Sequence, residues 1–120
     1  MIREYPLGTL VTQSEQCSDA NHVPFLLDET GAMLTAHVPR ANPVWQSVAA
    51  RPVLVIFHGP NAYVSPSWYA SKQTHGKVVP TWNYAVVHAR GAGRAIEDKV
   101  WLRSHLEALA GDHRRHAAFR

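Results

Sequence analysis

The sequence predicts a mainly β fold, a small antiparallel barrel or sandwich with flanking helices. Short stretches of alternating apolar and polar residues, separated by turn residues, recur through the first forty positions and again after position 80. Helical spacing appears just after position 42 and again close to the end of the sequence. A length of 120 residues suffices for one domain with one modest core, so residues 1–120 are predicted to form a single domain.

The first predicted strand covers residues 5–13, where apolar and polar side chains alternate. One face of this half-buried strand carries Tyr5, Leu7, Thr9 and Val11. The polar residues 13–20 that follow indicate a turn. They include Cys17, the single cysteine, which cannot form an intrachain disulfide and fits a reducing, cytoplasmic location.

Two further strands are predicted before residue 40. Residues 21–27 resume the alternation, although Pro24 cannot donate to a β-ladder and indicates an edge, a bulge or a ligand-facing stretch. Residues 28–31 are typical of a hairpin turn, and residues 32–38 form the third strand. Pairing through that turn would bring the start of the second strand opposite His37.

Two helices are predicted. In the first, Asn42 is a suitable N-cap and Pro43 suits the first helical position. Its apolar face carries Val44, Trp45, Val48 and Ala49. The second helix is capped by Asp98 and ends at Gly111. Its apolar positions are Trp101, Leu102, His105, Leu106 and Leu109.

Three further strands are predicted between these helices. Residues 53–57 form a continuous apolar run, which predicts a central strand buried on both sides. A tight turn at residues 59–61 leads into a short strand at residues 62–65, whereas residues 66–79 show no regular period. A long strand over residues 81–95 follows.

Composition and motifs restrict the classes of function. The net charge of +3 is compatible with nucleic acid or a phosphorylated cofactor without requiring either. No apolar stretch is long enough for a membrane helix, and the first residues lack a signal-peptide pattern. There is no P-loop, nucleophile elbow, zinc-ligand set or helix-turn-helix, so no catalytic or metal-binding residue is predicted. Several histidines are expected at the surface or in hydrogen-bonded rim positions: His58, His75, His88 and His105.

The segment from His37 to Pro43 is the most informative local feature. A helix that begins at Asn42 directs its first N–H groups outward with partial positive charge. Arg40 lies two residues before the cap, and His37 ends the incoming strand. Together they could form a phosphate-binding cradle. A simple helix cap beside a solvated surface arginine would give the same pattern.

Asn21 and His22 precede Val23 on the second strand. Their side chains could form hydrogen bonds with the polar edge of a flat ring. Polar residues at the beginning of a strand would look the same.

Two corners rich in proline and aromatic residues lie at residues 65–69 and 79–84. Their aromatic side chains, including Trp68 and Trp82, could stack on a planar ligand or pack across a subunit interface. The interface or a barrel rim is the favoured interpretation.

Read together, these segments resemble the PaiB-type family of negative transcriptional regulators. The strings PLGTLVT, DANHVPFLLD, HVPRANPVW, SPSWY, GKVVPTWNY and IEDKVWL carry the resemblance, which covers roughly residues 5–109. That family is related to pyridoxamine-phosphate oxidases and flavin reductases. The resemblance implies a six-stranded antiparallel split barrel that forms a homodimer and binds flavin mononucleotide (FMN) at the dimer interface.

The resemblance also implies roles for individual residues. The flavin ring would be lined by Asn21, His22 and Val23. The ribityl phosphate would be held by His37, Val38, Arg40 and Asn42. The barrel rim or the second subunit would contribute Trp68, Trp82 and Asn83. Family members extend further at both ends, which implies that residues 1–120 lack an N-terminal helical segment and a C-terminal stretch.

The resemblance favours a regulator over an enzyme. A flavin-dependent oxidoreductase or flavin reductase, and a cofactor-free dimeric scaffold, are the alternatives. Any DNA binding would rely on arginine side chains in salt-sensitive phosphate contacts, because no DNA-reading element is visible. No membrane association is expected.

Overall fold

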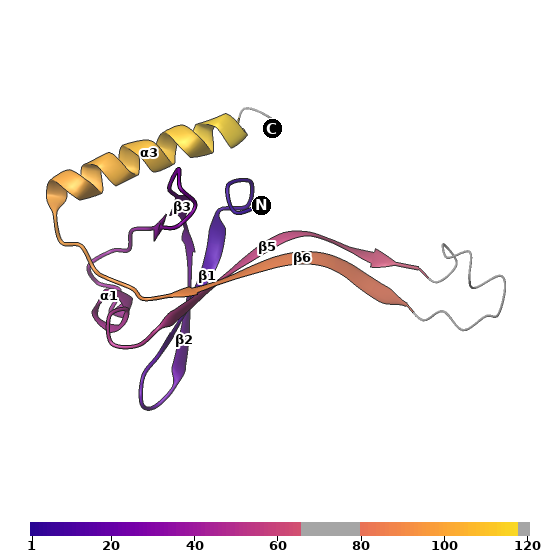
Figure 1. Cartoon of the computed structure of the whole chain (residues 1–120), viewed down its shortest axis with the longest axis horizontal. Helices are drawn as coiled ribbons and strands as arrows, with labels where there is room; N and C mark the ends of the chain where they lie inside the picture. The colour runs from indigo at the N-terminus through magenta and orange to yellow at the C-terminus, as the bar shows by residue number, and fades with distance from the viewer. Residues whose placement is uncertain (66–79, 118–120) are drawn as a thin grey trace.

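The computed structural model describes the backbone of residues 1–65 and 80–117, with side chains as far as Gly111. The elements in chain order are β1 (Leu7–Gln13), β2 (Ser18–Pro24), β3 (Leu26–Leu27), β4 (Leu34–Thr35), α1 (Val44–Ser47), β5 (Val53–Val64), β6 (Thr81–Gly91) and α3 (Lys99–Ala117). The predicted mainly β fold with antiparallel sheets and flanking helices is confirmed (Figure 1).

The strands form two sheets. Four strands pair in the order β2-β1-β5-β6, and β3 pairs with β4 in a short hairpin. All of these pairs are antiparallel. Within the described residues the larger sheet does not close on itself, so they do not form a closed six-stranded barrel.

The β1–β2 hairpin confirms the alternation but buries the other face of β1. Gly8, Leu10 and Thr12 are buried, whereas Leu7 is 61% exposed. The inward face is fixed by Gly8, whose missing side chain leaves room for neighbouring core residues. The turn is also shorter than predicted, because β2 already begins at Ser18. The Ser14 hydroxyl accepts hydrogen bonds from the Gln16 and Cys17 N–H groups and closes the turn.

The second predicted strand has other bounds in the structure, and the third is shorter than expected. β2 and β3 divide residues 21–27 between two sheets, because the segment changes partner after Pro24. The predicted turn at residues 28–31 is confirmed, with Gly31 at φ 76°. Pairing across it joins Leu27 to Leu34, and the strand ends at Thr35 rather than at residue 38.

β5 lies between β1 and β6, as the apolar run predicted. Only one of its faces is fully buried, however, since Ile56 is half-buried beside the buried Val55 and Phe57. The turn predicted at residues 59–61 is wrong, because β5 continues through it with a register shift between His58 and Asn61. Pro60 has no N–H to donate to the ladder, so a local irregularity replaces a regular pair. β6 ends at Gly91 rather than at residue 95.

Beyond that irregularity, β5 and β6 extend away from the other elements as a two-stranded ribbon (Figure 1). We call residues 61–64 with residues 81–84 the β5–β6 arm. Its aromatic side chains are exposed, with Trp82 at 55% and Tyr84 at 70%. The radius of gyration is 18.9 Å, whereas a compact domain of this length has a value of about 14 Å. The aromatic residues of the arm are therefore not buried against the other elements of the chain, as such residues usually are in a monomeric protein.

The core lies between the sheet, the β3–β4 hairpin and α1. Its buried members are Leu10, Phe25, Val44, Val55 and Phe57. The rings of Phe25 and Phe57 meet edge to face, with centroids 5.6 Å apart. Phe57 is completely buried and is the centre of this cluster.

Both helices differ in length from the prediction. α1 is a single turn that begins at Val44, one residue later than expected, and ends at Ser47. The side chain of Asn42 still accepts a hydrogen bond from the Val44 N–H at 3.0 Å. The Asp98 carboxylate caps α3 as predicted, accepting from the Val100 N–H at 2.9 Å. The helix continues past Gly111, because this glycine does not adopt the left-handed conformation that ends helices.

We expect Gly8→Ala to destabilise the protein by about 1–3 kcal/mol, the usual cost of an overpacked core. A Cβ at Gly8 would lie 2.9 Å from side-chain carbons of Phe25, Val55 and Phe57. Urea denaturation followed by circular dichroism measures the change. Gly91→Ala is the matched control, since a Cβ there meets nothing within 4 Å. Equal stabilities of the two variants would contradict the packing described for β1.

Candidate cofactor-binding cavity

A cavity of about 1000 Å³ lies between the sheet and α3. Core side chains such as Leu10, Val23 and Val55 form one wall. The opposite side is formed by the segment 92–98 and by Trp101 of α3. Most of the lining is apolar, and the volume reaches the upper end of the range for cofactor sites.

The corner at residues 37–43 forms one edge of this cavity. His37 and Val38 are half-buried in its wall, and Arg40 lies at its exposed rim. The Arg40 guanidinium forms an ion pair with Glu97 at 2.9 Å and lies over the Trp45 ring, 5.5 Å from its centroid. The Trp45 Nε1–H donates to the Arg40 carbonyl at 3.0 Å. Arg40 is thus positioned at the rim by contacts on both its backbone and its side chain.

An amide–amide hydrogen bond connects this corner to β2. The Asn42 Nδ2 donates to Asn21 Oδ1 at 2.9 Å. Because Asn42 also caps Val44, its side chain is occupied on both polar atoms. Neither Asn21 nor Asn42 is among the residues that line the cavity, and Val23 is the residue of β2 that does.

The other predicted site residues lie away from the cavity. His22 is on the outer face of β2, where its Nδ1 lies 3.1 Å from the Thr9 hydroxyl oxygen. Trp82 and Asn83 belong to the β5–β6 arm, and the Trp82 Nε1–H donates to Asn61 Oδ1 at 3.0 Å. Trp68 lies outside the described residues.

The short helix α1 adds little positive charge to the corner. α1 has one turn only, so its macrodipole is small, and the Val44 N–H is already bonded to Asn42. The positive charge at this corner comes from Arg40. Its ion pair with Glu97 is largely exposed, and exposed pairs contribute only about 0–1 kcal/mol. An anionic ligand could therefore replace Glu97 at small cost.

His105 was expected at the surface or in a hydrogen-bonded rim position, and this was wrong. It is 5% exposed, and its Nε2 has no hydrogen-bond partner among the described residues. Burial lowers the pKa of His105 below its ordinary value, and the neighbouring His37 lowers it further. The sequence signal for this burial was the position of His105 on the apolar face of the predicted helix. His58 and His88 are exposed as expected, and His75 lies outside the described residues.

Sequence comparison identifies the kind of domain that contains this cavity. A family model described as "Putative FMN-binding domain" matches residues 1–118. The chain belongs to this FMN-binding domain family. The expected resemblance to PaiB-type proteins is confirmed by this match and by the relatives that follow.

Three curated proteins are similar to this chain. The Bacillus subtilis protein named "Protease synthase and sporulation protein PAI 2" is 35% identical over 118 residues, covering 96% of this chain and 54% of that protein. An uncharacterised Saccharomyces cerevisiae protein is 38% identical over 95 residues, covering 75% of this chain and 56% of that protein. An uncharacterised Emericella nidulans protein is 30% identical over 146 residues, covering 92% and 58%. The chain thus spans about half the length of these relatives.

The cavity fits the cofactor that the family name implies. An isoalloxazine is flat and largely apolar, with polar atoms along one edge, and the cavity offers an apolar wall of matching character. His37 lines that wall, and its buried Nδ1 has no hydrogen-bond partner among the described residues. Arg40 supplies a cation at the rim for a phosphate. In the part of the chain that is described, no helix is long and apolar enough to cross a membrane.

Proposed function

We propose that this chain binds FMN in the cavity beneath α3. The observation that carries the proposal is that one large apolar cavity in an FMN-binding family member is bordered by Arg40 and His37. Val23 and Val38 contact the flavin ring in this proposal, while Arg40 exchanges Glu97 for the phosphate. Asn21 and Asn42 hold the corner in place through their amide hydrogen bond.

The active form in this proposal is a homodimer of split barrels. The support is the β5–β6 arm, whose exposed aromatic residues need a partner surface. Tyr63 and Trp82 pack against each other across the arm, with ring centroids 5.9 Å apart. They form a preorganised apolar surface of the kind found at the centre of interfaces. A second copy that packs against this surface would also complete the rim to which Trp82 and Asn83 were assigned.

The role that we propose for the dimer is that of a flavin-dependent regulator. The support is the resemblance to PaiB-type proteins and the similarity to the sporulation protein of Bacillus subtilis. When bound, FMN supplies the redox chemistry, and the protein positions and shields it. Contacts with DNA in this proposal come from exposed arginine side chains and depend strongly on salt.

A spectrum of the purified protein with added FMN tests the proposal directly. Binding is expected to shift the flavin absorption bands and quench the flavin fluorescence in a saturable manner. Bleaching of the bound flavin by a nicotinamide donor would favour an oxidoreductase over a regulator. A salt-dependent shift of DNA in a gel without turnover would favour the regulator. Spectra that do not change at any FMN concentration would refute FMN binding.

Arg40→Ala is expected to weaken FMN binding by about 1–3 kcal/mol, the scale of a lost charge-assisted hydrogen bond. Riboflavin has no phosphate, so its affinity should barely change. Fluorescence titration with both ligands measures the difference. Arg51→Ala removes the same charge from an exposed position before β5 and is the matched control. An equal loss of affinity for both ligands would show that Arg40 does not contact the phosphate.

A further inference from the structure

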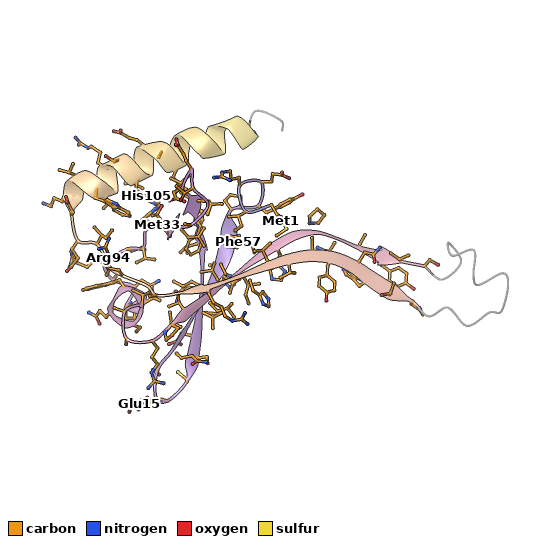
Figure 2. All side chains as sticks on the ribbon, viewed as in Figure 1. Met1, Glu15, Met33, Phe57, Arg94 and His105 are labelled. Atoms are coloured by element: carbon orange, nitrogen blue, oxygen red, sulfur yellow. The ribbon has the colours of Figure 1, made fainter. Side chains whose placement is uncertain are left out.

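α3 is held over the cavity by a narrow stripe of side chains. Trp101, His105 and Leu109 follow at four-residue intervals and therefore lie on one face of the helix. His105 and Leu109 are each 5% exposed, and Trp101 lines the cavity. The neighbouring apolar residues Leu102 and Leu106 are 39% and 42% exposed. Attachment of α3 thus relies on this narrow face, and His105 lies on the side of α3 toward the rest of the molecule (Figure 2).

His105 lies between two aromatic rings. It stacks on Trp101, with centroids 5.2 Å apart and planes at 3°. On another side it meets His37 edge to face, with centroids 5.5 Å apart. His37 belongs to the corner that borders the cavity, so this imidazole pair connects α3 to the rest of the molecule.

Both imidazoles carry a buried nitrogen without a partner. His37 Nδ1 and His105 Nε2 form no hydrogen bond within the described residues. No group of three metal-ligating side chains is found among the described residues either. The contact is therefore one between two rings, and burying a proton's charge on His105 would be costly there without a hydrogen-bond partner or counter-ion.

No neighbouring carboxylate is available to neutralise a proton on His105 in the described part of the chain. Glu97 is paired with Arg40, and Asp98 caps α3. Asp28 accepts hydrogen bonds within its own turn. The remaining charged groups on the elements around the pair form no ion pair or hydrogen bond with it: Met1 (amino terminus), Arg3, Glu4, Glu29, Arg94, Lys99, Arg103 and Glu107.

We propose that the His37–His105 contact is a pH-sensitive latch that holds α3 over the cavity when neutral and releases it when protonated. A proton on His105 would place a charge in a buried site that faces a second imidazole and has no counter-ion among the side chains described as far as Gly111. The helix leaves, the charge becomes solvated, and Trp101 no longer covers the cavity. The latch acts on the cavity whether its ligand is FMN or another molecule.

The direction of the pH dependence follows from the lowered pKa of His105. The released helix binds a proton at higher pH than the docked helix does, so docking loses free energy as protons are added. The free energy that neutral His105 contributes to docking is fully present above the ordinary histidine pKa of about 6.5. It is lost progressively as pH falls below that value. The effect can reach at most about tenfold per pH unit for one titrating group.

Hydrogen–deuterium exchange of the whole chain at pH 7.5 and 5.5 tests the latch. After correction for intrinsic exchange rates, we expect the amides of α3 to lose several-fold protection at pH 5.5, while those of β1 and β5 keep theirs. His105→Phe preserves the stacking on Trp101 without a titrating group, so its α3 protection should not depend on pH. His88→Phe makes the same change at an exposed position and should behave as the wild type does.

An NMR titration of the histidine ring protons provides a second measurement on the unmodified protein. His105 is expected to titrate below the ordinary histidine pKa of about 6.5, because burial and the neighbouring His37 lower its pKa. This measurement decides the matter even if His105→Phe does not fold. Wild-type α3 protection that is equal at both pH values, a persistent pH dependence in His105→Phe, or a His105 that titrates at or above the ordinary histidine pKa of about 6.5 would each overturn the latch.

Discussion

Phe57→Ala is expected to lower the free energy of unfolding by about 3–5 kcal/mol, one of the largest effects of a single core substitution. Phe57 is completely buried, and its ring meets Phe25 edge to face at the centre of the only core cluster in the described residues. Removing the ring leaves a void between β5, β1 and the β3–β4 hairpin that these short elements cannot close. Urea denaturation monitored by circular dichroism measures the loss.

Ile56→Ala is the control for this prediction. Ile56 lies next to Phe57 on the same strand, but its side chain points to the other, half-buried face of β5. A smaller loss of stability is therefore expected. If both substitutions cost the same free energy, Phe57 is not the centre of the core.

The double variant Trp82→Ser with Tyr84→Ser is expected to weaken the proposed dimer by about 2 kcal/mol or more, because buried aromatic residues dominate interface energies. That change corresponds to roughly a 30-fold increase in the dissociation constant. Both side chains are more than half exposed on the β5–β6 arm, so their replacement should leave the monomer fold intact. Sedimentation velocity over a range of concentrations measures the shift.

Val100→Ser provides the comparison for the arm. Val100 is 76% exposed on α3 and lies outside both the arm and the cavity lining. It should leave the monomer–dimer equilibrium unchanged. A wild-type chain that sediments as a monomer at all concentrations would refute the dimer, and an unchanged double variant would refute the role of the arm.

The sequence predicted secondary structure well where residues close in sequence allow only one conformation. The Asp98 cap of α3 and the turn ending at Gly31 are examples, because side-chain capping and a positive φ are decided within a few residues. The Gly59–Pro60 pair had two outcomes, a turn or an irregular strand. Pairing with β6 on both sides of it selected the second, and no local signal contains that information.

The candidate site was less predictable because its contacts join distant segments. Arg40 and His37 could be selected from residue type and position, and both border the cavity. Their partners, Glu97 and His105, lie 57 and 68 positions further along the chain. Only the return of the chain after β6 brings them to the corner. The buried face of β1 was missed for a similar reason, since Gly8 faces inward to admit side chains from other strands.

Because of the amide hydrogen bond between Asn21 and Asn42, the two sides of the cavity differ in how strongly their attachment depends on pH and salt. Neutral amides respond neither to protons nor to ionic strength, so this bond fastens the corner to β2 under all ordinary conditions. The facing side is attached by an exposed ion pair and an imidazole contact, both of which respond to the solution. The corner therefore keeps its position on β2, whereas the distance between the corner and the facing side depends on pH and salt concentration.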